Sequence, residues 1–259
     1  MSEQRIKLAY RQMGNKESDT TLIFLHGSTM TKEGMLPVAK GLSDYNCIAF
    51  DLTAHGESAG EEPGEITTFA EDLEYSIAQL QQDKIVGEKV VMLGYSMGGA
   101  ITCEVAIRKK LKLSGIVLLS SGADLNSYTP LVDELKKISV SEFDSSSLFS
   151  ALFGTDTPEE QKQPVVEIFE SIRVADEIGY GDLMVSNRYN KLSECGSIDI
   201  PALMVHGNGD KVVLPMAAVE TWKAIPNSEL LMVPYKGHAV MFEDKELVKE
   251  KIISFVEKL

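Results

Sequence analysis

Short apolar runs alternate along this chain with longer segments in which apolar residues recur every three or four positions. The short runs are nearly continuous in aliphatic residues, which is typical of parallel strands covered on both faces. The longer segments have the spacing of amphipathic helices. The alternation predicts an α/β fold with a mostly parallel, doubly wound sheet. The predicted strands are Thr21–Leu25, Asn46–Asp51, Lys89–Tyr95, Gly115–Ser120, Pro201–His206 and Glu229–Pro234.

The helical spacing is clearest in three segments, which are Thr67–Gln82, Gly98–Lys110 and Ala239–Leu259. In the first segment Thr68 is followed three residues later by Glu71, the pattern of a capping box at a helix N-terminus. Residues 4–11 predict an additional, antiparallel edge strand.

The strand–helix rhythm breaks between about Asp124 and Cys195. Helical patterns continue there, at Leu131–Ile138, Ser146–Phe153 and Pro158–Val174, without a core strand. A structureless loop of this length is uncommon inside a compact domain. We therefore predict two parts: a core of residues 1–123 and 196–259, and a helical cap of residues 124–195 inserted over the mouth of the sheet.

Composition excludes several classes of function. The net charge of −14 argues against binding to nucleic acid or to anionic lipid, and no apolar run approaches the roughly 20 residues that span a bilayer. The first residues lack the pattern of a secretory signal. Cys47, Cys103 and Cys195 are widely spaced, which indicates free thiols in a reducing compartment. We expect a cytoplasmic monomer or homodimer without nucleic-acid or membrane partners.

The chemistry of the chain is clearest at Gly94-Tyr95-Ser96-Met97-Gly98, between a predicted strand and a predicted helix. This arrangement places a serine nucleophile on a sharp strand-to-helix turn. Gly94 and Gly98 are required because a Cβ at either position would clash where strand and helix approach. The N–H of Met97 then points from the helix N-terminus toward the oxygen that becomes negative during acyl transfer.

A serine needs a base to take its proton. Of the four histidines, His26, His55 and His206 each precede a glycine near a strand end, which favours structural roles in turns. His238 instead follows Gly237 just past the last strand. That position lies at the carboxyl edge of the sheet, where open α/β sheets place their sites, so we predict His238 as the base.

The third group of the triad is an acid that orients the base. Asp210 follows a strand end on a glycine-rich turn at the same edge, and the order Ser96, Asp210, His238 along the chain favours it. Asp124 is the main alternative and Glu243 a weaker one.

A second oxyanion donor is expected from the loop after the strand Thr21–Leu25. Gly27 lets the backbone approach closely there, and the N–H of Ser28 would join that of Met97. The amide of Thr29 is the alternative donor.

These motifs together resemble the α/β-hydrolase fold superfamily over nearly the whole chain. The blocks that carry the resemblance are Leu25-His26-Gly27-Ser28, Asp51-Leu52-Thr53-Ala54-His55-Gly56-Glu57-Ser58, Gly94-Tyr95-Ser96-Met97-Gly98-Gly99, and Gly237-His238 after His206-Gly207-Asn208-Gly209-Asp210. The resemblance implies a small serine carboxylesterase-like member with a helical cap. Thr53-Ala54 stand where relatives often carry Pro-Gly, which changes a turn.

The serine at the strand-to-helix turn, called the elbow, argues against epoxide opening and halide displacement, since relatives with those activities have a carboxylate at this position. Proline-specific peptidases of the superfamily usually have a tryptophan-containing elbow, which this chain lacks. Hydrolysis of a small-molecule ester with a small to medium acyl group is the leading interpretation. The alternatives are carbon–carbon bond hydrolysis of diketones and a receptor-like, ligand-binding role. No metal or organic cofactor is predicted, because no ligand cluster or phosphate loop is present.

Apolar residues of the predicted cap have two interpretations. They could line an acyl pocket, but at helical spacing such residues more often form the core of their own domain. The residues concerned are Leu148, Phe149, Leu152, Phe153, Phe169 and Met184.

Overall fold

A seven-stranded sheet crosses the molecule in the computed structural model, which describes residues 5–259. The strands are β1 (Tyr10–Gly14), β2 (Thr20–Leu25), β3 (Asn46–Phe50), β4 (Lys89–Tyr95), β5 (Gly115–Leu119), β6 (Ala202–Gly207) and β7 (Ser228–Val233). Their order in the sheet is β1-β3-β2-β4-β5-β6-β7. The edge strand β1 is antiparallel to β3, and all other neighbours are parallel. The prediction of a mostly parallel α/β sheet is confirmed.

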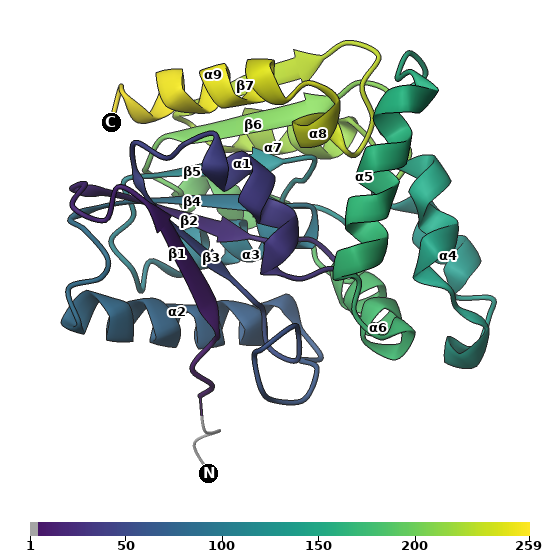
Figure 1. Cartoon of the computed structure of the whole chain (residues 1–259), viewed down its shortest axis with the longest axis horizontal. Coiled ribbons are helices and arrows are strands. Elements are labelled where there is room, and N and C mark those ends of the chain that lie inside the picture. The colour runs from purple at the N-terminus through teal and green to yellow at the C-terminus, as the bar shows by residue number, and fades with distance from the viewer. Residues whose placement is uncertain (1–4) are drawn as a thin grey trace.

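Helices cover both faces of this sheet (Figure 1). One apolar layer packs under α2 (Ile66–Gln82), α3 (Met97–Arg108) and α7 (Met216–Ala224). The other packs under α1 (Leu36–Lys40), α8 (Val240–Glu243) and α9 (Lys245–Val256), with the short helix η1 (Lys32–Met35) beside α1. The sheet is therefore buried on both sides, which explains its nearly continuous apolar strands.

The segment 124–195, called the insertion below, lies between β5 and β6. Its helices are α4 (Pro130–Leu135), η2 (Val140–Glu142), η3 (Ser145–Ala151), α5 (Glu159–Ile172) and α6 (Asp176–Ser186), and η4 (Leu192–Ser197) begins at its end. In Figure 1, α4, α5 and α6 lie together beside one end of the sheet. Within the described residues, no helix is long and apolar enough to cross a membrane.

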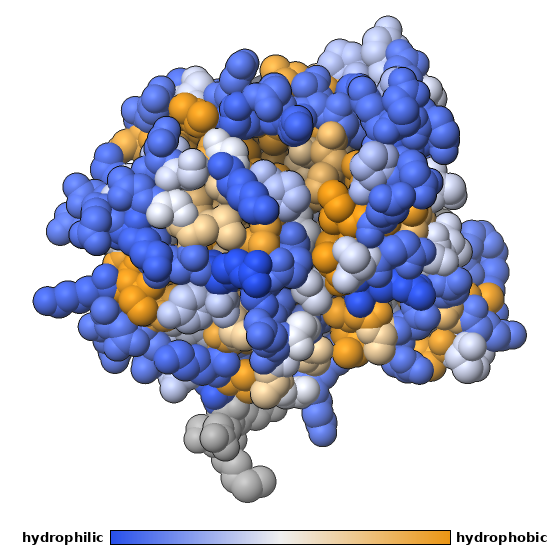
Figure 2. All heavy atoms as spheres, in the orientation of Figure 1, coloured by the Kyte–Doolittle hydropathy of each residue, from blue (hydrophilic) through white to orange (hydrophobic). Residues whose placement is uncertain are grey.

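The outer surface is mostly hydrophilic, in keeping with the high content of charged residues (Figure 2). Apolar side chains reach it between α1, α5 and α8, where they line a groove of about 260 Å³. Val38, Val165, Ile168 and Phe242 contribute to that groove.

Four local predictions differ from the structure. The edge strand runs over Tyr10–Gly14 instead of 4–11, and residue 4 lies outside the described residues. The capping box is wrong, because α2 begins at Ile66 and Thr68 is already inside it. The C-terminal helix is divided at Asp244, whose backbone is not helical. Helix α6 was not predicted.

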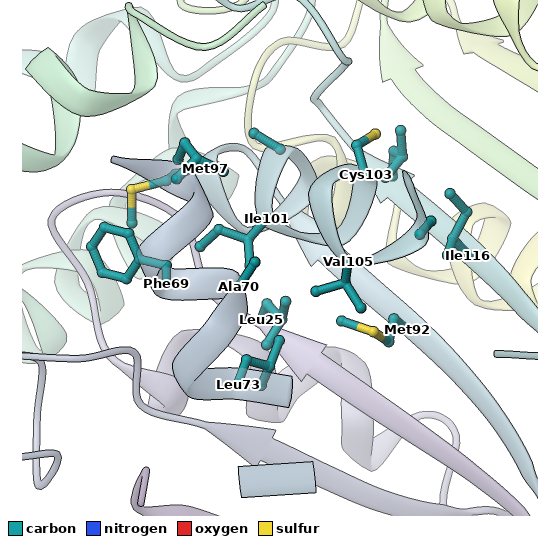
Figure 3. Close-up of a cluster of buried hydrophobic side chains, with 14 of the residues drawn as sticks. Leu25, Phe69, Ala70, Leu73, Met92, Met97, Ile101, Cys103, Val105 and Ile116 are labelled. Carbon is teal, nitrogen blue, oxygen red and sulfur yellow. The ribbon is translucent and has the colours of Figure 1, made fainter. Parts of the chain in front are cut away.

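The packing around α3 shows how the core supports the strand-to-helix turn at Ser96 (Figure 3). Ile101 and Val105 of α3 point toward Leu25 and Met92 of the sheet. Met97, the first residue of α3, contributes to the same cluster of buried side chains on this face of the sheet. Such contacts hold the start of α3 against β2 and β4, and they thereby stabilise the turn between β4 and α3.

Glycines at the turn allow this approach. A Cβ on Gly98 would lie 2.5 Å from the carbonyl oxygens of Leu25 and His26, and a Cβ on Gly94 would overlap the carbonyl of Gly98. Backbone atoms cannot move aside as flexible side chains do, so the glycine requirement inferred from the sequence has a direct steric cause.

Gly98→Ala tests this requirement. Although alanine is the better helix former, the clash with two carbonyls should lower the free energy of unfolding by about 1–3 kcal/mol. Gly64→Ala is the matched control, since nothing lies within 4 Å of its added Cβ, and it should change stability by less than about 0.5 kcal/mol. Urea denaturation measures both, and equal stability of the two variants would contradict the steric argument.

Candidate active site

Ser96 lies between the last residue of β4 and the first residue of α3, with φ of 50° and ψ of −118°. A non-glycine residue at positive φ is strained and persists only where its surroundings hold it. The N–H of Ser96 donates to the carbonyl of Leu119 at 3.0 Å, and the hydroxyl of Ser121 donates to the carbonyl of Ser96 at 2.6 Å. These bonds to β5 and its following loop hold Ser96 at the carboxyl edge of the sheet.

The loop after β7 brings His238 to Ser96. His238 Nε2 lies 3.1 Å from Ser96 Oγ, and His238 Nδ1 lies 2.8 Å from Asp210 Oδ2. Because a carboxylate only accepts hydrogen bonds, Nδ1 carries the ring proton, and Nε2 is the acceptor that faces the serine hydroxyl. The structure thus brings three of the predicted site residues into one chain of hydrogen bonds.

Asp210 is held on both carboxylate oxygens. Its Oδ1 accepts the N–H groups of Val212 and Val213, and its Oδ2 lies 3.1 Å from His206 Nε2 in addition to His238. Burial raises the pKa of Asp210, but His238 and His206 outweigh it and hold that pKa well below its usual value of 3.8. Sequence reasoning treated His206 as a turn residue only and missed its contact with the acid.

The main alternative acid is occupied elsewhere. Asp124 accepts a hydrogen bond from the N–H of Ser127 at 2.9 Å, as a turn-forming aspartate does. Among residues 5–259 it makes no hydrogen bond with His238.

Glu243, the weaker alternative for the acid, accepts hydrogen bonds from two different loops. It accepts the N–H of Gly154 at 2.8 Å and the N–H of Gly237 at 2.7 Å. Beside it, the N–H of Ala239 donates to the carbonyl of Leu152 at 2.8 Å. The insertion is therefore hydrogen bonded to the loop that carries His238, and Glu243 supports the position of that loop.

His26 fills a structural role in the loop after β2. Its Nδ1 donates to the carbonyl of Gly27 at 2.8 Å, and its Nε2 accepts the N–H of Leu52 at 3.0 Å. Burial, together with the nearby His55, lowers the pKa of His26 to about 3. His26 is therefore a neutral, fully buried side chain at neutral pH.

The two predicted oxyanion donors are the backbone amides of Met97 and Ser28. The N–H of Met97 is at the first position of α3, where no intrahelical acceptor is available. Ser28 lines the cavity next to Ser96. The N–H of Thr29, by contrast, donates to Asp182 Oδ2 at 2.8 Å, so this amide is already used. Of the two candidate donors from this loop, Ser28 is the one left to face an oxyanion.

The cavity in front of Ser96 and His238 is narrow and apolar, with a volume of about 40 Å³. Typical ligand pockets have roughly 300–1,000 Å³. Six apolar insertion residues were given two interpretations, as a cavity wall or as the core of the insertion. Four of them line this cavity, whereas Phe153 and Met184 do not line it and pack within the apolar clusters. The four are Leu148, Phe149, Leu152 and Phe169.

Metal-ligating side chains and thiols do not form a second centre in the described part of the chain. Within residues 5–259, no three His, Cys, Asp or Glu side chains are placed so that they could hold a metal ion. Cys47, Cys103 and Cys195 are buried and free. Burial raises the pKa of the Cys47 thiol to about 12, which makes it a poor nucleophile.

The arrangement can carry out nucleophilic acyl transfer. Ser96 Oγ can pass its proton to His238 Nε2, and Asp210 stabilises the imidazolium that forms. The Met97 and Ser28 amides can accept the negative charge that develops on the carbonyl oxygen.

Comparison with known proteins identifies related sequences. The family model described as Hydrolase_4, serine aminopeptidase S33, matches residues 16–245. A proline iminopeptidase of Saccharolobus solfataricus is 25% identical over 282 residues, which cover 98% of this chain and 90% of that protein. A protein of Haemophilus influenzae described as a putative 2-succinyl-6-hydroxy-2,4-cyclohexadiene-1-carboxylate synthase is 33% identical over 141 residues. That alignment covers 53% of this chain and only about half (52%) of the relative.

Solved structures show the same fold. A lipase-esterase related protein from Clostridium acetobutylicum has a TM-score of 0.85 and 28% identity, covering 96% of this chain and 99% of that one. A thermophilic esterase from Thermogutta terrifontis has a TM-score of 0.80 and 20% identity, covering 100% and 96%. The second likeness shows the fold alone.

Asp210→Asn tests the ionised state of the buried acid. Because its pKa is lower in the folded protein than the usual 3.8, ionised Asp210 stabilises the fold above that pH, and this stabilisation is lost as the pH falls through the folded value. The difference in unfolding free energy between wild type and Asp210→Asn should therefore shrink between about pH 5 and about pH 3.

Urea denaturation across this pH range measures that difference, with Asp124→Asn as the control for loss of a buried carboxylate. A difference for Asp210→Asn that does not change with pH would contradict the lowered pKa.

Proposed function

We propose that this chain, which belongs to the α/β-hydrolase superfamily and to its serine aminopeptidase S33 family, is a serine hydrolase that cleaves carboxylic esters with small to medium acyl groups. The observation that carries the proposal is the chain of hydrogen bonds from Ser96 through His238 to Asp210, which opens into an apolar cavity. The likeness to the lipase-esterase related protein of Clostridium acetobutylicum supports it.

In the first half of the proposed reaction, Ser96 Oγ attacks the acyl carbon while His238 Nε2 accepts the hydroxyl proton. The carbonyl oxygen becomes an alkoxide held by the N–H groups of Met97 and Ser28. His238 then gives its proton to the leaving alcohol, and the acyl group remains on Ser96. In the second half, water loses a proton to His238 as it attacks the acyl carbon. The bond from that carbon to Ser96 Oγ then breaks, His238 returns the proton to Ser96 Oγ, and the acid is released.

The cavity wall favours a neutral ester over a charged substrate. An aminopeptidase must recognise a free ammonium group, for which a carboxylate is the natural partner. A substrate with a carboxylate group would need a lysine or arginine. Within the described part of the chain, the residues that line the cavity include no acidic side chain, lysine or arginine. The low polarity of the wall therefore supports an uncharged acyl group.

Substitution of the triad tests the mechanism. Ser96→Ala and His238→Ala should each lower kcat for p-nitrophenyl acetate by at least ~10³-fold, because each removes a group that acts in the transition state. Circular dichroism and thermal unfolding check that both variants fold.

Asp210→Asn and Asp124→Asn form the matched pair for the acid. The first should lose activity through disorientation of the His238 ring, and the second should retain it. The reverse result would assign the acid to Asp124. Wild-type protein that is folded but shows no Ser96-dependent ester turnover would favour diketone cleavage or a ligand-binding role instead.

The narrow cavity predicts a preference for short acyl chains. Across p-nitrophenyl esters from acetate to decanoate, kcat/KM should fall as the chain lengthens, and Phe149→Ala should move the optimum to longer chains by enlarging the cavity. Phe143→Ala is the control, since Phe143 packs against Tyr180 and does not itself line the cavity. An unchanged chain-length profile in Phe149→Ala would contradict the assignment of this cavity to the acyl group.

A further inference from the structure

Thr29 follows the proposed oxyanion donor Ser28, and both its N–H and its carbonyl are hydrogen bonded to the insertion. Its N–H donates to Asp182 Oδ2 of α6 at 2.8 Å, and its carbonyl accepts the N–H of Val174 at 3.0 Å. Thr29 has φ of 67°, which is unfavourable for a β-branched residue. Gly179 of α6 allows the close approach, because a Cβ there would lie 2.9 Å from Thr29 Cγ2. The conformation of this loop therefore depends on bonds from the insertion.

Asp182 is also paired with a histidine of the core. Its Oδ2 lies 3.0 Å from His55 Nε2, while His55 Nδ1 lies 2.8 Å from the carbonyl oxygen of Thr53. Both ring nitrogens of His55 therefore lie at hydrogen-bond distance from oxygen atoms. Burial lowers the pKa of His55, but Asp182, the Thr53 carbonyl and Glu62 together outweigh burial, so the pKa lies above its usual value. Asp182 is thus a fully buried carboxyl group paired with a fully buried histidine.

Two neighbouring peptide units connect this carboxylate to the oxyanion donor. The N–H of Ser28 belongs to a peptide whose carbonyl, that of Gly27, is held by His26 Nδ1 at 2.8 Å. The next peptide carries the N–H of Thr29 that Asp182 holds. The two peptide units share the Cα of Ser28. Because each unit is planar and each is held by a hydrogen bond, the direction of the Ser28 N–H is fixed.

We propose that Asp182 is a positioning residue for the oxyanion hole, which aims the N–H of Ser28 by holding the N–H of Thr29. This inference rests on the proposed function. It gives the insertion a part in transition-state stabilisation, although Asp182 itself is fully buried and does not line the cavity. Positioning matters because an oxyanion donor acts only when it is aimed at the developing charge.

Asp182→Ala removes the acceptor of the Thr29 N–H. We expect kcat for p-nitrophenyl acetate to fall about 10- to 100-fold, the range for loss of a supporting contact behind a reactive group, while KM changes less than about threefold. Asp182→Asn keeps an amide oxygen that can accept from Thr29, so it should restore most of kcat. Asp176→Ala is the matched control, since Asp176 begins the same helix and binds Ser145 within the insertion.

A trifluoromethyl ketone gives a readout that a merely structural role would not move. Ser96 Oγ adds to its carbonyl carbon, the serine proton passes to His238, and the resulting alkoxide occupies the oxyanion hole. Its inhibition constant should rise in Asp182→Ala by about the factor by which kcat falls.

A double variant guards against failure to fold. Replacement of both members of a buried ion pair by apolar residues is often neutral for stability. His55→Leu with Asp182→Leu should therefore fold and show the same losses. If Asp182→Ala or the double variant folds and keeps both kcat and the inhibition constant within about threefold of the wild-type values, the inference is overturned. Absence of Ser96-dependent turnover in the wild type would instead remove the proposed function.

Discussion

The close approach of α3 to β2 and β4, which glycine permits at positions 94 and 98, is the constraint on which the rest of the site depends. It brings the carbonyls of Leu25 and His26 against the first turn of α3. The loop after β2 and the N-terminus of α3 therefore lie side by side, and their amides can face one point in space. The strained backbone of Ser96 follows from the same geometry, because the chain must reverse direction within one residue.

Most of the fold follows from local patterns in the sequence. The buried parallel strands are apolar throughout, so β2, β4 and β6 were predicted within a residue or so of their observed bounds. Helix α6 was missed because its glycines lower helix propensity. These glycines leave room for tertiary contacts, since Gly179 packs on Thr29 and the carboxyl of Glu62 lies where a Cβ on Gly181 would be.

Part of the candidate site also follows from local sequence, whereas another part depends on tertiary packing. Ser96 and Met97 lie in a motif whose local geometry is known, so sequence alone could place them. The spacing of Leu148 and Met184 is equally consistent with a cavity wall and with the core of the insertion, and only packing separates them. The pairing of Asp182 with His55 joins residues far apart in the chain, and no local pattern predicts it.

The insertion is bonded to both loops that flank Ser96. Glu243 and Ala239 connect it to the loop of His238, and Thr29 connects it to the loop of Ser28. A segment attached in this way is not an interchangeable module. Grafting the corresponding segment of a relative onto this core would replace the contacts that hold the loop of His238 and the loop of Ser28, together with the cavity wall. Divergence of substrate preference in such a protein is therefore expected to proceed by single residues along the cavity wall, because exchange of the whole segment would also displace these two loops.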